Sequence, residues 1–459
     1  MGYREEEDTL GKVKVPEDKF WGAQTQRSLE NFAVSNELMP IEVIHALALI
    51  KKHAAHVNAD LGLLPEEKQA LIAKAAEEIV AGRYDAHFPL TVWQTGSGTQ
   101  TNMNVNEVIA NIANVLAGTS LGAKAPIHPN DDVNRSQSSN DVIPSAIALA
   151  VTSLVHRKLI PALSDFIKMV EKKMKEFKGV VKCGRTHLMD ATPLTLAQEF
   201  SAYAGSLSDA KEHIEAALKQ TVRLALGGTA VGTGFTAHPD FGARVCMRLD
   251  EELKLPFTAS GNKFAALSTL DSILPLSSAL RFLAGALYKM ASDIRLLASG
   301  PRCGIGELNL PANEPGSSIM PGKVNPTQCE SLTQVALQVM GFDAVVAMAS
   351  TQGHLQLNVY RPIVAYNTIR SIHLLADSLV NFSHRCLKGI TPNLKKIHAH
   401  LENSLMLVTA LSSHIGYERS ARIAKLAHEK GITLKAATLE LGLLTAEEFD
   451  RYVVPESMT

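Results

Sequence analysis

Residues 143–177 read IPSAIALAVTSLVHRKLIPALSDFIKMVEKKMKEF, and this run decides the fold. Its apolar side chains recur three and four residues apart, the spacing of one face of an α-helix. They are Ile143, Ala146, Ile147, Ala150, Val151, Leu154, Val155, Leu159, Leu163, Phe166, Ile167, Val170, Met174 and Phe177. The run is about three times as long as an average helix. We expect Pro161 to kink it, because proline cannot donate a helical hydrogen bond.

Four further stretches have the same helical spacing, namely 194–226, 270–297, 332–348 and 363–387. Patterns that alternate apolar and polar residues, as strands do, are scarce. Five long helices predict an all-α protein built around an elongated bundle. Their apolar faces exceed what one chain would bury, which favours an oligomer.

The segments before and after the bundle differ from it in character. Shorter helical patterns cover 43–58 and 65–81, and shorter stretches follow a Thr-Pro-Asn turn at 391–393. A chain of 459 residues is long enough for two or three domains. We therefore predict an N-terminal domain at 1–139, a central helical bundle at 140–390 and a C-terminal domain at 391–459.

Composition excludes several classes of protein. A formal net charge of −1 argues against nucleic acid or an anionic membrane as partner. The five cysteines are far apart and include no CxxC, so we expect no disulfide framework, no metal site, no cofactor and a reducing compartment. The acidic N-terminus resembles no signal peptide. The weakly polar run 142–155 is shorter than the ~20 apolar residues that span a bilayer. A cytoplasmic location is the expectation.

One irregular stretch is rich in groups that hold anions. Residues 316–330 read GSSIMPGKVNPTQCE, and their glycines and prolines exclude a continuous helix. An ordinary surface loop is the alternative. Backbone N–H groups in such a turn can form an anion-binding concavity, and the side chains that favour an anion are Ser317, Ser318, Lys323 and Asn325.

Two other polar segments lie directly before helical patterns. The segment GSGTQTN at 96–102 has neither the P-loop ending nor the GxGxxG pattern of nucleotide sites. The segment SSND at 138–141 precedes the longest run, with Asp141 expected as N-cap and Pro144 in the first turn. A helix N-terminus also favours an anion.

Two segments carry histidines outside the helical patterns. GRTHLMDATP at 184–193 places His187 between two long helices, and HPNDD at 128–132 is typical of a polar turn. A lone histidine in a loop is more often structural than catalytic. Histidine nevertheless exchanges a proton near neutral pH.

These segments together resemble a known family. GSSIMPGKVNP at 316–326 resembles the signature loop of the fumarase/aspartase superfamily, and TQCE at 327–330 resembles its class II fumarase branch. The resemblance extends from WGAQTQRS at 21–28 to LKAA at 434–437. It implies a small N-terminal domain, a central five-helix bundle, a small C-terminal domain and a homotetramer with a twenty-helix core.

The resemblance implies reversible hydration of fumarate to L-malate in the tricarboxylic acid cycle. Removing the C3 proton of malate gives an aci-carboxylate, whose extra charge needs preorganised donors. The family pattern makes Ser317 the base, and a serine oxyanion would need nearby N–H groups and positive charge. It assigns His187, oriented by Glu330, to the hydroxyl side of the reaction, where the family's histidine acts through a water.

The resemblance also assigns two sets of binding residues. The substrate set is Ser97, Thr99, Ser138, Ser139, Asn140, Thr186, Ser318, Lys323 and Asn325. The second set would bind another dicarboxylate at an accessory, non-catalytic site, and consists of His128, Asn130 and Asp131. The family implies that each catalytic site draws its residues from three subunits.

The chain departs from the family pattern at three positions, with Met189 where Gln is common and Ala265 and Gln356 where Glu is usual. Two alternatives stay open. Aspartate ammonia-lyase shares the loop and the intermediate, although residues 327–330 argue against it. A structural member of the superfamily without activity is the other, and the complete set of site residues argues against that.

Overall fold

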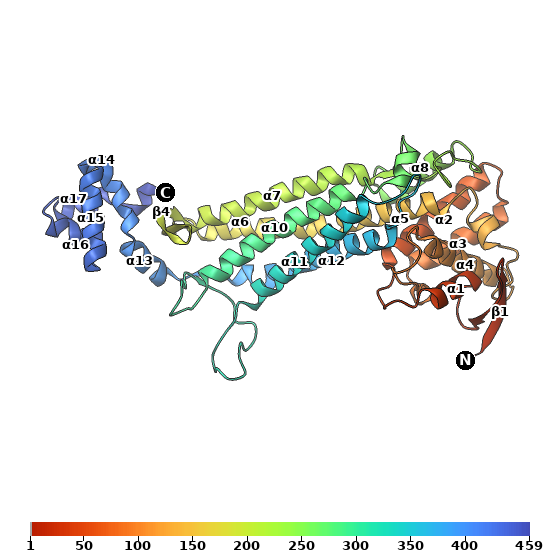
Figure 1. Cartoon of the computed structure of the whole chain (residues 1–459), viewed down its shortest axis with the longest axis horizontal. Coiled ribbons are helices and arrows are strands. Elements are labelled where there is room, and N and C mark those ends of the chain that lie inside the picture. The colour runs from red at the N-terminus through yellow and green to blue at the C-terminus, as the bar shows by residue number, and fades with distance from the viewer. Residues whose placement is uncertain (1) are drawn as a thin grey trace. The chain divides into compact units, whose positions relative to one another are not determined.

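The computed structural model describes residues 2–459 and confirms an all-α protein (Figure 1). The described residues form seventeen α-helices and four small two-stranded sheets. The chain divides into two compact units. The first comprises Met1–Pro161, Lys211–Ala284 and Gln338–Ala376, and the second Ala162–Ala210, Gly285–Leu337 and Asp377–Thr459.

The first unit begins with a hairpin that the sequence did not predict. Strands β1 (Tyr3–Asp8) and β2 (Gly11–Pro16) pair antiparallel. All residues of β1 except the first are charged, and the Lys-Val alternation in β2 is only four residues long, so the pair carries little of the apolar pattern that marks a strand. Four helices follow: α1 (Ala23–Asn31), α2 (Ile41–Asp60), α3 (Glu66–Val80) and α4 (Thr99–Leu116). Helices α2 and α3 confirm the predictions at 43–58 and 65–81.

The long helical run is confirmed. It consists of α5 (Ser139–Leu154), a π-helical turn at Val155–Leu159 and α6 (Ile160–Glu176). Pro161 cannot donate to the carbonyl four residues back, at Arg157. The wider π-helical turn lies where that bond would form. The distortion predicted at Pro161 is therefore a π-helical turn.

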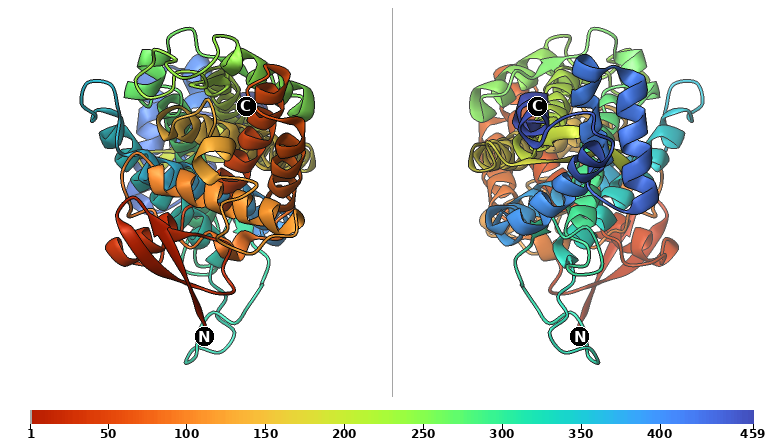
Figure 2. Two further views of the ribbon diagram at one scale, coloured as in Figure 1. Left: turned by 90° about the vertical axis from the view of Figure 1, so that its right-hand side faces the viewer. Right: turned by 90° about the vertical axis from the view of Figure 1, so that its left-hand side faces the viewer.

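The other four long helices are α7 (Leu196–Thr221), α10 (Leu274–Leu297), α11 (Thr327–Ser350) and α12 (Arg361–Arg385). Figure 1 labels all four as long helices, and Figure 2 shows the same chain from its two sides. In the first unit, Thr152 of α5 donates to Thr221 of α7 at 2.6 Å, and Ser277 of α10 donates to Asp343 of α11 at 2.6 Å. In the second, Tyr203 of α7 donates to Asp293 of α10 at 3.1 Å.

The remaining elements are short. In the first unit they are α8 (Phe241–Leu253), α9 (Lys263–Ser268) and the parallel pair β5 (Arg223–Leu224) and β6 (Thr258–Ala259). In the second they are the hairpin β3 (Val181–Thr186) and β4 (Met189–Thr195), the pair β7 (Leu308–Asn309) and β8 (Thr391–Pro392), and helices α13 (Leu394–Asn403), α14 (Ser412–Ile415), α15 (Tyr417–Lys430), α16 (Leu434–Glu440) and α17 (Ala446–Tyr452). Helices α13 to α17 contribute to a core cluster that includes Leu401, Ile423 and Phe449.

Two helical runs are long and apolar enough to cross a membrane by length and composition alone, Ser139–Glu176 and Thr327–Ser350. In the first, 67% of the most apolar window is buried, as in the core helix of a folded protein. In the second the buried share is 39%, so α11 leaves much apolar surface uncovered.

Among the described cysteines, Cys183, Cys246, Cys329 and Cys386 are buried and Cys303 is exposed. All five are free thiols. Burial raises the pKa of the Cys246 thiol to about 12, which keeps it protonated at neutral pH.

Candidate active site

A chain of hydroxyl groups joins the GSGTQTN segment at 96–102, here called the glycine loop, to the start of α5. Ser97 Oγ lies 2.7 Å from Thr99 Oγ1, which lies 2.8 Å from Ser139 Oγ. Gly98 is the N-cap of α4 with a φ of 75°, a backbone conformation that glycine adopts without strain. Three of the predicted substrate-binding residues, from segments about 40 positions apart, are therefore in direct contact.

The first turn of α5 is closed by a capping box. Ser138 is the N-cap, and its Oγ accepts the N–H of Asn140 at 3.2 Å. Asp141 accepts the backbone N–H of Ser138 at 3.0 Å. The prediction that Asp141 is the N-cap is wrong, because Asp141 is the third residue of the helix and completes the box. Pro144 likewise lies inside the helix, beyond the first turn.

Asp141 also anchors a distant loop to this turn. Its buried carboxylate accepts the N–H groups of Gly227 at 3.1 Å and Thr229 at 2.9 Å. Burial raises the pKa of Asp141 to about 6. The Asn140 side chain donates to the Ala230 carbonyl at 2.8 Å, which leaves its second N–H for a ligand.

Lys51 of α2 is fully buried in the same unit. Its Nζ donates to Asn134 Oδ1 at 3.2 Å and Gln137 Oε1 at 3.3 Å. Burial lowers the pKa of Lys51 to about 7, against the attraction of the Asp141 carboxylate. Sequence reasoning missed Lys51. The available signal was a charged residue on an apolar helical face, which is rarely buried without partners.

The His187 segment is a hairpin turn, whereas a loop between two long helices was predicted. Thr186 pairs with Met189, so His187 and Leu188 form a two-residue turn between β3 and β4. Both have positive φ, 55° and 62°. This conformation favours Asn and Gly, and it is strained for other residues. The hairpin holds the exposed imidazole of His187 at its tip.

Buried ion pairs hold the same hairpin at its base. Glu307 is 1% exposed at its side chain and lies 2.8 Å from Arg185, 3.2 Å from Lys182 and 3.0 Å from His400 Nδ1. Lys182 also pairs with Glu199 at 3.0 Å. Lys182 and Arg185 belong to β3, so this network connects the strand that carries Thr186 to α7 and α13.

The signature loop folds onto itself around Gly316. The Gly316 N–H donates to the Lys323 carbonyl at 2.8 Å, and the Asn325 side chain donates to the Gly316 carbonyl at 2.7 Å. A Cβ at Gly316 would lie 2.6 Å from the Lys323 oxygen, so only glycine fits this approach.

Ser317 accepts two backbone hydrogen bonds within the loop. Its Oγ lies 3.2 Å from the N atom of Ile319 and 3.0 Å from that of Met320. Two N–H donors aimed at one hydroxyl oxygen stabilise negative charge on it. Ser318 and Lys323 are exposed on the same loop.

Glu330 lies in the first turn of α11, four residues after the loop. Within the described part of the chain it makes no hydrogen bond to His187. The orienting role assigned to Glu330 stays a prediction.

The accessory segment forms a π-helical turn, Pro129–Val133, capped by His128. His128 Nδ1 accepts the N–H groups of Asn130 at 3.3 Å and Asp131 at 3.1 Å. It also lies 3.2 Å from the Asp131 carboxylate. Because Nδ1 accepts these bonds, the neutral ring carries its proton on Nε2.

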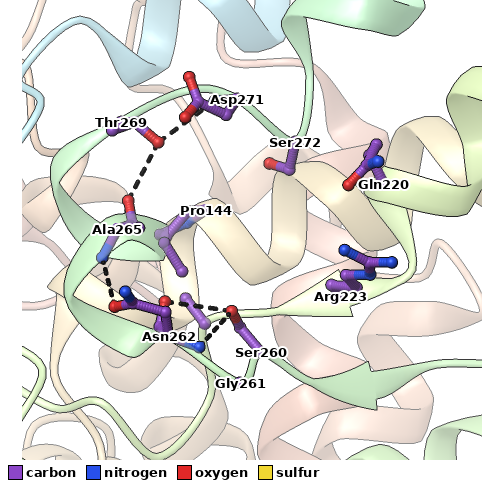
Figure 3. A pocket seen from close by; sticks show the side chains of 12 residues that line it. Pro144, Gln220, Arg223, Ser260, Gly261, Asn262, Ala265, Thr269, Asp271 and Ser272 are labelled. Atoms are coloured by element: carbon purple, nitrogen blue, oxygen red, sulfur yellow. Dashed lines mark hydrogen bonds between the residues drawn. The ribbon is translucent and has the colours of Figure 1, made fainter.

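A separate cleft of about 300 Å³ lies in the first unit (Figure 3). Hydrogen bonds along one wall join Ser260, Asn262, Ala265 and Thr269. Arg223 also lines it, and among the described residues it makes no ion pair. The cleft contains none of the predicted site residues, and of the three departures from the family pattern only Ala265 lines it.

Comparisons with known proteins agree with the predicted family. A family model described as lyase matches residues 11–341, and one described as fumarase C C-terminus matches residues 407–459. Among similar relatives, fumarate hydratase class II of Thermosynechococcus vestitus is 56% identical over 99% of this chain and 97% of its own. Fumarate hydratase class II 1 of Pseudomonas aeruginosa is 55% identical over 99% and 98%.

A solved structure agrees with these relatives. The crystal structure of recombinant class II fumarase from Schistosoma mansoni is 43% identical and superposes with a TM-score of 0.97. That match covers 100% of this chain and 99% of the other. Identity and fold agree over the full length, and the chain belongs to the class II fumarate hydratase family of lyases.

Proposed function

We propose that this chain is a fumarate hydratase, which interconverts fumarate and L-malate by anti addition and elimination of water. The observation that carries the proposal is the pair of N–H groups directed at Ser317 Oγ, from Ile319 and Met320. A serine hydroxyl is a poor base at neutral pH. Two backbone donors that stabilise its oxyanion give it the means to remove a proton from carbon.

The reaction proceeds through an aci-carboxylate. Ser317 takes the C3 proton of malate, and the electron pair moves onto the neighbouring carboxylate. Lys323 and Asn325 stabilise the added charge, because a cation and an amide donor on a preorganised loop need little rearrangement. His187 protonates the departing hydroxyl group, which leaves as water, and Glu330 orients the imidazole. No metal or cofactor takes part.

Most of the groups in the predicted substrate set are neutral donors. The connected hydroxyls of Ser97, Thr99 and Ser139 support this role, since a linked set can turn its protons toward one anion. The other neutral members are Ser138, Asn140, Thr186, Ser318 and Asn325, and Lys323 is the one cation. Neutral donors suit a chain whose net charge gives no general attraction for anions.

The active assembly is a homotetramer in which the bundles of four chains form a twenty-helix core. Helix α11 supports this, because it is apolar over its length but only 39% buried in its most apolar window. Exposed Leu337 and Met348 lie on it. We assign the chain to the cytoplasm and the tricarboxylic acid cycle, with the predicted three-domain layout, and we place each site among three subunits.

The test is ultraviolet absorbance near the fumarate band after addition of L-malate to purified protein. We expect a rise with L-malate, none with L-aspartate, and the same rate when a chelator is present. A rise with aspartate alone would identify an ammonia-lyase. The absence of turnover with every substrate that yields fumarate would show a structural protein without activity.

A further inference from the structure

Arg361, at the start of α12, is fully buried and joins three segments of the first unit. One guanidinium nitrogen donates to the Asn140 carbonyl at 2.8 Å, and the other terminal nitrogen donates to the Leu267 carbonyl at 2.6 Å. Its backbone N–H donates to the Gly96 carbonyl at 3.0 Å. Two of the segments that carry predicted substrate-binding residues, 96–99 and 138–140, are therefore bonded by this one residue.

The bond to Asn140 replaces one that the helix cannot make. In an α-helix, the N–H of residue 144 would donate to the carbonyl of residue 140. Pro144 has no N–H, so the Asn140 carbonyl has no helical partner. A buried carbonyl without a partner is costly. The Arg361 guanidinium supplies the missing donor, from a residue 221 positions away.

The glycine loop approaches the same region closely. A Cβ at Gly96 would lie 1.5 Å from the carbonyl oxygen of Val359, two residues before Arg361. Only glycine fits there, and the backbone bond from Arg361 to Gly96 follows directly. A shift of residues 359–361 would thus move the loop that carries Ser97 and Thr99.

Arg361 also places a positive charge next to the 138–140 segment. Burial lowers its pKa to about 10, while the Asp141 carboxylate favours the charged form, so the guanidinium is charged at neutral pH. The buried Arg361 guanidinium and the buried Asp141 carboxylate thus place opposite charges in this part of the first unit. Positive charge in a buried setting attracts anions more strongly than it would in water.

We propose that Arg361 is a positioning residue for the substrate-carboxylate site, holding the 96–99 and 138–140 segments in register through Asn140, Gly96 and Leu267. This inference rests on the proposed function. The inference goes beyond the proposed function, because Arg361 is not among the predicted substrate-binding residues and donates only to the backbone carbonyls of Asn140, Leu267 and Gly96. Pro144 explains the need for this contact, because it has no N–H to donate to the Asn140 carbonyl that Arg361 bonds.

The first experiment compares two Arg→Gln variants in steady-state kinetics with L-malate. We expect Arg361→Gln to raise KM by ~10-fold or more and to keep kcat within a few-fold, because carboxylate contacts act in both ground and transition states. Arg223→Gln, at an exposed arginine of the Figure 3 cleft, should match wild type. Arg361→Lys should recover only part of the affinity, because one ammonium group cannot span the Asn140 and Leu267 carbonyls as the planar guanidinium does.

The second experiment restores the helical donor. In Pro144→Ala/Arg361→Gln, the new N–H of residue 144 can bond the Asn140 carbonyl. We expect its KM to fall at least ~3-fold below that of Arg361→Gln, while Pro144→Ala alone matches wild type. A general loss of stability would not be repaired by this particular N–H. If Arg361→Gln does not fold, Pro144→Ala and the double variant are compared, and KM should be higher in the double variant.

A wild-type KM in Arg361→Gln, or no recovery in the double variant, would overturn the proposal for Arg361 while leaving the function intact. In the fallback comparison, equal KM values would overturn the proposal that Arg361 also acts through Leu267, since that is the side-chain bond that the new N–H does not replace. Inactive wild-type protein would instead refute the proposed function. Binding of L-malate, measured by calorimetry on the same variants, then tests Arg361 alone: affinity that drops in Arg361→Gln and recovers in the double variant supports it, and unchanged affinity overturns it.

Discussion

The carboxylate of Glu307 lies 2.8 Å from the guanidinium of Arg185, two residues before His187. Burial raises the pKa of Glu307, but Arg185 and Lys182 outweigh that effect and hold the pKa below its ordinary value. Glu307 is therefore ionised at neutral pH, and it balances two cations at the base of the His187 hairpin.

Glu307→Gln should destabilise the protein and lower kcat/KM, because it leaves Lys182 and Arg185 without their shared counter-charge. Breaking a buried ion pair costs about 3–5 kcal/mol. Thermal melting and malate turnover are the measurements. Glu5→Gln is the control, since Glu5 pairs with Lys12 on the surface and such pairs contribute about 0–1 kcal/mol. Equal melting temperatures for both variants would contradict this.

Ser317→Ala should fold and assemble normally and lose at least ~10²-fold in kcat, the usual scale for an acid–base group. The two N–H groups at residues 319 and 320 would then have no hydroxyl to stabilise. Ser413→Ala, at an exposed serine, is the matched control. Turnover close to wild type in Ser317→Ala would remove this serine as the base.

The same His→Asn substitution should affect kcat differently at the two histidine sites. His128→Asn should keep kcat within a few-fold of wild type, because Asn can also cap the turn at 129–133. His187→Asn should lose ~10²-fold or more. Both are assayed in one buffer without citrate or other dicarboxylates. Large equal losses would mean that the catalytic histidine is wrongly assigned or that the two sites are one.

Subunit mixing tests whether sites are shared. Ser317→Ala and His187→Asn chains are each expected to be inactive. Reassembled together, they should recover part of the activity, because some sites would receive an intact Ser317 from one chain and an intact His187 from another. Verified mixed tetramers with no activity would show that both residues of a site come from one chain.

The burial of Lys51 should make the stability of the folded protein depend on pH. Its pKa is about 7 in the folded protein and near 10.5 when unfolded, so the unfolded state binds more protons between these values. Below pH 7 the buried ammonium group is charged and destabilises the folded protein to its full extent. This destabilisation decreases as pH rises above 7. The melting temperature of wild type should rise relative to Lys51→Met between pH 7 and 9.5. A constant difference would contradict a buried, titrating Lys51.

Periodicity was sufficient to predict the bundle from the sequence. Apolar residues on one helical face identify long helices wherever they lie, so 143–177 and the four later runs were found. The β1–β2 hairpin was missed because β1 is almost entirely charged and β2 alternates Lys and Val over only four residues. The His187 hairpin was missed because its turn uses His and Leu where Asn and Gly are usual.

The predicted site residues lie in turns, and the groups that support those turns were not found from the sequence. Lys51 bonds residues 134 and 137, and Arg361 bonds residue 140. These pairs are separated by 83 to 221 positions, and local patterns hold no information about such partners. Motif resemblance predicted which turns form the site, whereas only the fold identifies the buried groups that bond those turns.

Of the five cysteines, Cys303 alone is exposed, and it lies four residues before Glu307. A maleimide dye should therefore label each native chain at one position without any substitution. Donor- and acceptor-labelled chains could then be mixed, and energy transfer between them would report subunit exchange directly. The same label would count the chains in an assembly by stepwise photobleaching, giving an optical measure of stoichiometry that needs no catalytic turnover.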